Sequence, residues 1–184
     1  LNLFTKIYGV GPKKAQGLID KEITTIEKLK ENENLLNDTQ KIGLKYYNEL
    51  QERIPRSEID LYSEKLHNIF DQIKDEVPGS EFEIVGSYRR GAQNSGDIDV
   101  IITNKNNDKK IFNLFLDKLI EDNILIEILT RGKTKSLTIG KLPDHKPRRL
   151  DFLYSDYDEY AFAILYFTGS KSFNTNMRQR ALKK

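Results

Sequence analysis

The chain of 184 residues contains 30 Lys and Arg against 28 Asp and Glu, which gives a formal net charge of +2. Such a small charge excludes a uniformly basic nucleic-acid binder, so any basic surface must be a local patch. The absence of cysteine excludes disulfides and thiolate metal sites and fits an intracellular protein. No apolar run approaches the ~20 residues of a membrane span. Periodic apolar stretches indicate one globular domain or two small ones.

Two short helices joined by a glycine turn are predicted at the N-terminus. A helical run through residue 7 is interrupted by the glycines of residues 9–11, and Pro12 suits the first position of a second helix. Glycines let a backbone come close to a ligand, and free amides at a helix start attract phosphate. The pattern indicates a helix-hairpin-helix motif; an ordinary turn with solvated lysines is the alternative. The residues that would contact DNA are Gly9, Gly11, Lys13 and Lys14.

Further helices complete an all-helical N-terminal unit. Thr24 or Thr25 can cap a helix over residues 26–30, and Asn37 or Asp38 can cap another that Pro55 ends. Tyrosines on the second helix could stack on bases, but aromatic residues at helical spacing are more often core. The expected apolar stripe of that helix comprises Ile42, Tyr46, Leu50 and Ile54.

A long helix leads into the second part of the chain, which we expect to be α+β. Residues 57–60 match a capping box, and the apolar stripe behind them predicts a helix that Pro78 and Gly79 close. We therefore expect the second domain to begin near Ser57. The stripe comprises Ile59, Tyr62, Leu66, Ile69, Phe70 and Ile73.

A polar segment between two predicted strands carries the first candidate site. Residues 81–85 alternate as a half-buried strand does, Gly86 and Ser87 end it, and a second strand covers residues 97–102. Side chains i and i+2 share a face of a strand, so Asp97 and Asp99 point the same way. Two carboxylates so placed can converge on a hard divalent cation such as Mg²⁺. A solvent-facing strand is the alternative, although Asp is depleted in strands.

Asp151 supplies a third carboxylate. It lies in a strand-like run, residues 148–154, that is otherwise apolar after its arginines. A carboxylate among hydrophobic residues needs a partner, because an unpaired buried charge is costly. Metal coordination or an ion pair with Arg149 would provide one.

The remaining segments alternate between helices, strands and a basic turn. We expect a helix over residues 111–121, a strand over 124–129, and helices over 156–167 and 172–184. The basic turn at residues 131–135 is either a solvated hairpin tip or a phosphate contact. Gly169 would serve as the C-cap of the helix before it.

These motifs, in this order, resemble the signatures of family X DNA polymerases. The resemblance is carried by GSYRRG at residues 86–91, GDIDV at 96–100, RLD at 149–151 and YFTGS at 166–170. It extends over the whole chain and is nearest to the beta member of the family. It implies three parts: a helical helix-hairpin-helix domain (1–56), a nucleotidyltransferase palm with a mixed β-sheet and flanking helices (57–170), and the start of a truncated nucleotide-selection subdomain (171–184).

The resemblance also implies roles for single residues. Two Mg²⁺ ions, with Mn²⁺ as an alternative, would be held by the catalytic residues Asp97, Asp99 and Asp151. Backbone groups that would bind a monovalent cation, Na⁺ or K⁺, beside a DNA phosphate belong to Thr5, Ile7 and Val10. The nucleotide would be bound by Gly86, Ser87, Arg90, Ser95, Gly96, Tyr166, Phe167, Gly169 and Asn174. Besides the hairpin residues, DNA would be bound by Arg131, Thr134, Lys135, Arg149 and Arg178.

The implied function is a monomeric DNA-directed DNA polymerase that adds dNTPs to a primer 3′-hydroxyl during gap filling in base excision repair. It would act at DNA, in the nucleus of a eukaryote or in the virion or cytoplasm of a viral system. The lyase domain and most of the nucleotide-selection subdomain would lie outside this sequence, so we expect weak or no activity from this fragment. Lys171 stands where the beta enzyme has an acidic residue. A template-independent nucleotidyltransferase and a non-catalytic DNA-binding fragment are the alternatives.

Overall fold

The computed structural model describes residues 2–182, and the chain divides into two compact units between Glu52 and Arg53. From the sequence we expected a first boundary after residue 56 and a further part at 171–184, of which residues 183 and 184 lie outside the described residues. The N-terminal unit ends at Glu52 and the C-terminal unit begins at Arg53. Each unit is described by itself.

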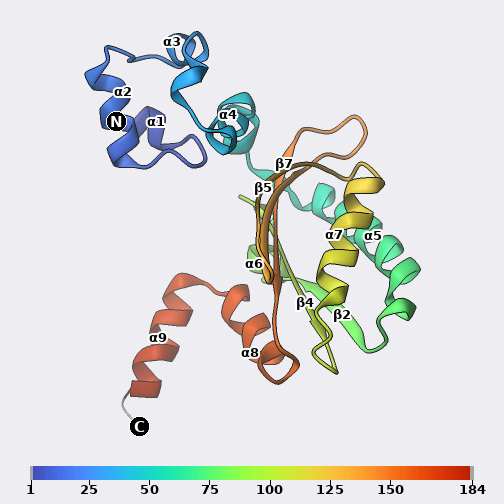
Figure 1. The fold of residues 1–184 in the computed structure, drawn as a ribbon. Coiled ribbons are helices and arrows are strands. Elements are labelled where there is room, and N and C mark those ends of the chain that lie inside the picture. The colour runs from blue at the N-terminus through green and yellow to red at the C-terminus, as the bar shows by residue number, and fades with distance from the viewer. Residues whose placement is uncertain (1, 183–184) are drawn as a thin grey trace. The chain divides into compact units, whose positions relative to one another are not determined.

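The N-terminal unit is entirely helical, as predicted (Figure 1). Pro12 occupies the first turn of its second helix, and the Thr25 and Asn37 side chains cap the third and fourth by accepting hydrogen bonds from backbone amides. Its α-helices are α1 (Asn2–Thr5), α2 (Pro12–Asp20), α3 (Ile26–Lys30) and α4 (Asp38–Lys45), with 3₁₀ turns η1 (Glu33–Leu35) and η2 (Glu49–Gln51). The core comprises Phe4, Ile7, Val10, Ala15, Leu18, Ile23, Leu29, Leu36 and Leu44.

The fourth helix is shorter than its apolar stripe predicted. It ends at Lys45, and the chain continues through η2 to a short strand β1 (Ile54–Pro55). Ile54 is buried because it pairs with Ser95 in a two-stranded sheet and joins the core of the C-terminal unit. Apolar residues four apart therefore belong here to two elements, and helical spacing alone could not separate them.

The C-terminal unit is built around a five-stranded mixed sheet with the order β2-β4-β7-β6-β5. Only the β4–β7 pair among these neighbours is parallel. The strands of this sheet are β2 (Ser80–Ile84), β4 (Ile98–Asn104), β5 (Leu125–Arg131), β6 (Lys135–Gly140) and β7 (Arg148–Tyr154). Strand β3 (Asn94–Ser95) lies outside it and pairs with β1. The helices are α5 (Arg56–Ile73), η3 (Lys74–Glu76), α6 (Gly86–Arg89), α7 (Lys110–Glu121), α8 (Tyr157–Thr168) and α9 (Lys171–Leu182). The predicted α+β class is confirmed.

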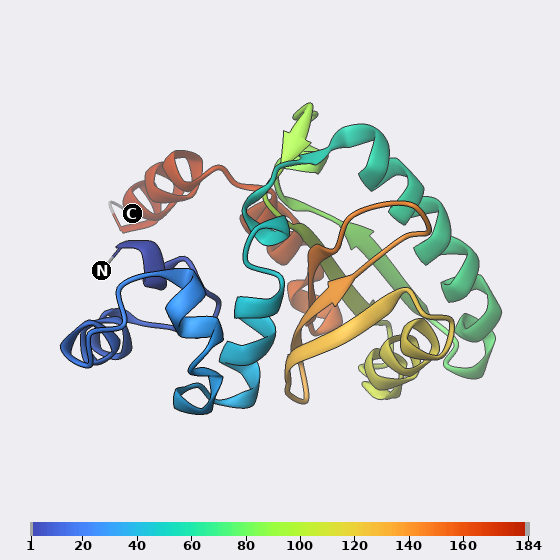
Figure 2. The ribbon, with the colours of Figure 1, turned by 90° about the horizontal axis from the view of Figure 1, so that it is seen from above.

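Helices cover both faces of this sheet. Helices α5 and α7 lie on the same side (Figure 1), and Figure 2 shows this layer from above. All six residues of the predicted α5 stripe are buried there, beside Val100 and Phe152 of the central strands. Helix α8 packs on the other face through Ala163 against Val85 and Ile101. None of the helices within residues 2–182 combines the length and apolar character that crossing a membrane requires.

The start of α5 differs from the predicted capping box. The helix begins at Arg56, and Pro55 is its N-cap residue without any side-chain cap. The Arg56 amide instead donates a hydrogen bond to the Gln93 carbonyl, at 2.8 Å. A distant loop therefore satisfies the amide of the first helical residue, which lies before the predicted cap at Ser57.

Candidate active site

The two central strands bring three carboxylates together. Asp99 in β4 and Asp151 in β7 are register partners in the parallel pair. Ile98 and Val100 alternate into the core, which turns Asp99 to the opposite face. One carboxylate oxygen each of Asp97, Asp99 and Asp151 lies within 4.8 Å of the other two. Asp97 was expected inside the strand, but β4 begins one residue later, at Ile98, and Asp97 is exposed at its entrance.

The carboxylate cluster has more negative charge than its surroundings compensate. Burial, followed by the charges of Asp97 and Asp151, raises the pKa of Asp99 from 3.8 to about 7. Burial also raises the pKa of Asp151, although Arg149 opposes this by donating from Nη2 to Oδ1 at 2.7 Å. Converging oxygen ligands with unfavourable mutual charge are the donor set that a hard divalent cation stabilises. The residues therefore fit a divalent metal ion.

A glycine places the turn after β2 against this cluster. Gly86 has a φ of +70°, and a Cβ built there would lie 2.9 Å from Asp99 Oδ2. The Val85 amide donates to the Asp99 carbonyl at 2.8 Å, which fixes the start of the turn. Ser87 Oγ and Ser95 Oγ are hydrogen-bonded at 2.6 Å and close the loop formed by residues 86–96. We call it the phosphate loop after the role predicted for it from the sequence. The structure thus brings Gly86 against Asp99 and joins Ser87 to Ser95 across the loop.

Arg90 links the phosphate loop to the end of α8. Its Nη1 donates to the Thr168 carbonyl, and it lies 3.1 Å from the position of a Cβ at Gly169. Gly169 has a φ of +69° and is the C-cap of α8, as the sequence predicted. The phosphate loop and the YFTGS segment therefore meet, although they are far apart in the sequence.

Two predicted nucleotide and DNA residues of α9 turn back on α8. Asn174 Nδ2 donates to the Tyr166 carbonyl at 2.7 Å. Arg178 donates to the Tyr166 hydroxyl and lies over its ring, 5.0 Å from the centroid. Within residues 2–182 the buried Asn174 Oδ1 accepts no hydrogen bond. Helix α9 thus contacts Tyr166 at its carbonyl, its hydroxyl and its ring. Phe167 is exposed.

The basic residues of the predicted turn at 131–135 lie in two different environments. Strands β5 and β6 form an antiparallel hairpin that contains it. Arg131 donates to Asp117 of α7 at 2.8 Å. Lys135 instead lines a cavity of about 110 Å³ with Asp99, Asp151 and Phe167, and its charge lowers the pKa of Asp151. The sequence did not indicate that Lys135 faces the carboxylates, because only the β6–β7 register places it there.

Sequence reasoning also missed Arg53. Its Nε donates to Asn94 Oδ1 at 2.8 Å, and its Nη1 lies 3.3 Å from the position of a Cβ at Gly96. This exposed arginine therefore places a positive charge directly beside the phosphate loop. A polar residue at the start of the C-terminal unit carries no periodic signal that would have revealed this contact.

The predicted hairpin of the N-terminal unit is well defined. Gly9 has a φ of +84°, and its carbonyl accepts a hydrogen bond from Gln40 Nε2 at 2.9 Å. Lys14 donates to the Leu35 carbonyl, whereas Lys13 is exposed. A surface cavity of about 500 Å³ along α2 is lined by Gly11, Lys13, Lys14, Gly17, Leu18, Lys21 and Leu35. The monovalent cation at the Thr5, Ile7 and Val10 backbone stays a prediction.

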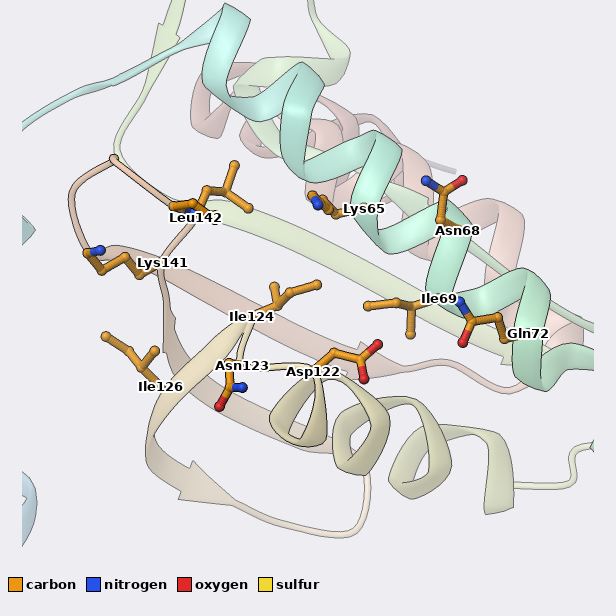
Figure 3. A pocket seen from close by; sticks show the side chains of 11 residues that line it. Lys65, Asn68, Ile69, Gln72, Asp122, Asn123, Ile124, Ile126, Lys141 and Leu142 are labelled. Atoms are coloured by element: carbon orange, nitrogen blue, oxygen red, sulfur yellow. The ribbon is translucent and has the colours of Figure 1, made fainter.

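A cavity of about 640 Å³ lies apart from all of these residues (Figure 3). It opens between α5 and the segment that follows α7, with Asn68 and Gln72 on one side and Asp122 and Asn123 on the other. None of the site residues predicted from the sequence lines it. The carboxylate cluster therefore does not coincide with this hollow; it lies on the opposite face of the sheet.

Comparisons with known proteins agree with this geometry. Residues 53–157 match the family model of the DNA polymerase beta palm, and residues 2–51 match that of the fingers domain of DNA polymerase lambda. The whole chain is 32% identical to DNA polymerase lambda of Arabidopsis thaliana and 35% identical to that of Rattus norvegicus. It is 26% identical, over 97% of its length, to DNA nucleotidylexotransferase of Xenopus laevis.

The chain spans 36%, 33% and 42% of these relatives' own lengths, respectively. The palm model alone covers more than half of the chain and contains all three aspartates. The chain belongs to the family X DNA polymerases.

Proposed function

We propose that the chain is the DNA-binding and catalytic part of a DNA-directed DNA polymerase. Such an enzyme adds dNTPs to a primer 3′-hydroxyl, as in repair gap filling. The observation that carries this proposal is the convergence of Asp97, Asp99 and Asp151, with one oxygen each within 4.8 Å. The phosphate loop and the end of α8 adjoin this cluster. Acidic residues beside a loop that can hold phosphates suit nucleotidyl transfer better than hydrolysis of an uncharged substrate.

Asp97, Asp99 and Asp151 would hold the divalent ions, Mg²⁺ or Mn²⁺. Ions bound there would favour the deprotonated primer hydroxyl and neutralise charge on the phosphates. Among the ligands, Asp151 combines a raised pKa with a cationic neighbour, Arg149. A carboxylate poised in this way can accept the proton of the primer hydroxyl, and a water molecule is the alternative acceptor.

The reaction forms a bond between the primer 3′-oxygen and the α-phosphorus and breaks the bond to the β-phosphate, so pyrophosphate leaves. Ser87, Arg90 and Gly96 would bind the triphosphate, and Arg53 adds a charge beside Gly96. Arginine suits this position because its charge persists at any working pH and its donors match phosphate oxygens. Ser95 contributes by holding Ser87, at 2.6 Å.

The end of α8 would receive the nucleoside. Tyr166, Phe167 and Gly169 form a surface of rings and bare backbone beside Arg90, which suits the packing of a sugar. Asn174, which donates to the Tyr166 carbonyl, would contact the incoming base, as the resemblance implies. DNA phosphates would be contacted by the hairpin of the N-terminal unit and by the residues that the resemblance implies, Arg131, Thr134, Lys135, Arg149 and Arg178.

The Arg149–Asp151 pair would act as a gate. The ion pair, at 2.7 Å, occupies a carboxylate oxygen that metal or primer would need. Substrate binding would draw Arg149 away and free Asp151. An Arg149→Ala change should weaken this gating, and unchanged pre-steady-state rates would count against the idea.

The test of the proposed function is addition of single dNTPs to a one-nucleotide-gapped duplex with Mg²⁺. Addition of the complementary dNTP alone, lost in Asp99→Asn and kept in the matched control Asp122→Asn, supports a templated polymerase. Asp122 suits this control because it lies in the cavity of Figure 3, away from the cluster. Full activity of Asp99→Asn would contradict the proposal.

The likeness to a DNA nucleotidylexotransferase favours a second candidate, template-independent addition. The same experiment separates the two, because an untemplated transferase adds any of the four dNTPs to the gap. DNA binding without addition, unchanged in Asp99→Asn, would support a non-catalytic fragment.

A further inference from the structure

We infer that Arg56 is a positioning residue that sets the shape of the phosphate loop and thereby the affinity for the triphosphate. This inference rests on the proposed function, since it concerns the same loop. Arg56 is the first residue of α5, and its amide donates to the Gln93 carbonyl at 2.8 Å. The helix start and the loop are therefore joined by a backbone hydrogen bond before any side chain is considered.

The Arg56 guanidinium bridges the turn within the loop. Its Nη1 donates to the Tyr88 carbonyl at 2.7 Å and to the Ala92 carbonyl at 3.2 Å. The same turn is closed from inside by the Gly91 amide, which donates to the Tyr88 carbonyl, and by the Ala92 amide, which donates to the Ser87 carbonyl. Arg56 thus fixes both ends of the turn from outside.

A ring contact adds a second hold on the same turn. The Arg56 guanidinium lies over the Tyr88 ring, 4.3 Å from its centroid. The Tyr88 hydroxyl donates to Asp60 Oδ1, one turn further along α5, at 2.6 Å. Tyr88 is therefore held at its carbonyl, its ring and its hydroxyl by the first turns of one helix.

Tyr88 lies between the two side chains that are proposed to bind phosphate. Ser87 precedes Tyr88, and Arg90 follows two residues later. Arg56 bonds to backbone carbonyls rather than to the side chains of those residues, so its effect reaches the triphosphate through the loop. Among residues 2–182, no carboxylate forms an ion pair with the Arg56 guanidinium. Its hydrogen bonds to the two carbonyls are charge-assisted, which makes them stronger than neutral ones.

The contacts of Arg56 depend on the planar shape of its guanidinium rather than on its charge alone. A planar guanidinium can stack on a ring while it bonds to two carbonyls, whereas a lysine ammonium is a point charge on a flexible stem. Arg56→Lys therefore keeps the charge beside the loop and removes the bridge. This substitution separates a positioning role from a purely electrostatic one.

The experiment compares the chain with Arg56→Lys and with a matched Arg180→Lys control, an exposed arginine of α9. Hydrogen exchange at the Gly91 and Ala92 amides reports the loop directly and needs no activity. Titration with Mg²⁺ and a non-hydrolysable dNTP reports the triphosphate site. We expect about tenfold faster exchange at both amides and about tenfold weaker dNTP binding in Arg56→Lys, the equivalent of one charge-assisted hydrogen bond. Mn²⁺ affinity without nucleotide should be unchanged, as should every readout in Arg180→Lys.

Unchanged exchange in Arg56→Lys would overturn the inference, because the loop would then keep its shape without the bridge. Faster exchange with unchanged dNTP affinity would also overturn it, since the loop would not determine binding. If the unsubstituted chain binds no dNTP, the proposed function fails, and the exchange measurement still decides whether Arg56 sets the loop. Arg56→Gln serves as a second variant and should show both effects more strongly.

Discussion

At the scale of single residues, the carboxylate cluster sets a conflict between stability and function. Asp99 has a pKa raised from 3.8 to about 7, mainly by burial. The folded protein therefore binds this proton more tightly than the unfolded chain does. The resulting destabilisation is absent below pH 3.8 and complete above about pH 7.

Asp99→Asn should relieve this destabilisation. We expect the free energy of unfolding of the metal-free protein to rise by roughly 1 kcal/mol or more at pH 8 and to change little at pH 4. Urea unfolding with a chelator present measures both values. A loss of stability at pH 8 would mean that the carboxylate is compensated in the folded state.

Arg149 tunes the third carboxylate. Its positive charge and its hydrogen bond lower the pKa of Asp151 against the effect of burial. Arg149→Ala should therefore raise this pKa further, and Mn²⁺ binding should begin at higher pH than in the unchanged protein. Mn²⁺ titrations between pH 5.5 and 8 test this, with Lys74→Ala as a control that removes an exposed ion pair. Identical pH midpoints in all three proteins would contradict the assignment.

At the scale of elements, a buried ion pair joins α5 to β7. Arg148 donates from Nε to Glu58 Oε2 at 2.5 Å, and both side chains are less than a tenth exposed. Arg148 also donates to the Arg53 carbonyl. The pair therefore connects α5, whose first residue is hydrogen-bonded to the phosphate loop, to the strand that contains Asp151.

Removing one partner should leave a buried charge unpaired. We expect Glu58→Gln to lower the free energy of unfolding by about 3–5 kcal/mol, and Glu58→Leu with Arg148→Met to recover much of this loss. Denaturant unfolding measures each variant. A double variant as unstable as the single one would show that the hydrogen bonds, rather than the unpaired charge, dominate.

Two glycines on helices of the N-terminal unit provide a matched pair. A Cβ at Gly43 of α4 would lie 2.7 Å from the Tyr8 carbonyl, whereas nothing lies within 4 Å of one at Gly17 of α2. Gly43→Ala should destabilise by about 1–3 kcal/mol through overpacking. Gly17→Ala should be neutral or stabilising by up to about 1 kcal/mol, since alanine favours helix. Thermal unfolding compares them, and equal effects would contradict the packing of α4.

The elements also show what the sequence could predict. The α5 stripe and the β7 bounds were correct because apolar period and burial agree there. The end of α4 and the start of α5 were wrong because residues 54–56 bond to the phosphate loop, and contacts so distant in sequence leave no local pattern. Asp97, Asp99 and Asp151 were singled out as polar exceptions in apolar runs. Arg53, which is exposed, and Arg56, which is half-buried, were missed because a single arginine in a polar stretch leaves no pattern in the sequence.

At the scale of the whole molecule, two compact units suggest a division of roles. The carboxylates and the phosphate loop lie in the C-terminal unit, and the lysine-lined surface of α2 lies in the N-terminal unit. The net charge of +2 makes such a local surface necessary for DNA binding. A substitution in the N-terminal unit should therefore weaken contact with DNA phosphates without changing metal binding by the C-terminal unit.

Lys13→Ala should weaken DNA binding without changing Mn²⁺ affinity. We expect the slope of log affinity against log salt to become shallower by about one, as the loss of one phosphate contact predicts. Lys28→Ala, at an exposed lysine of α3, is the control. Fluorescence anisotropy with a gapped duplex measures the slopes, and equal slopes for all three proteins would exclude a phosphate contact by Lys13.

The most direct test of the central claim is a Mn²⁺ titration in the presence of a non-hydrolysable dNTP. The claim is that Asp97, Asp99 and Asp151 together form a divalent-metal site for nucleotidyl transfer. We predict tight binding by the unchanged chain and by Asp122→Asn, and at least about tenfold weaker binding by Asp99→Asn and Asp151→Asn. Equal Mn²⁺ affinity in all four proteins would contradict the claim.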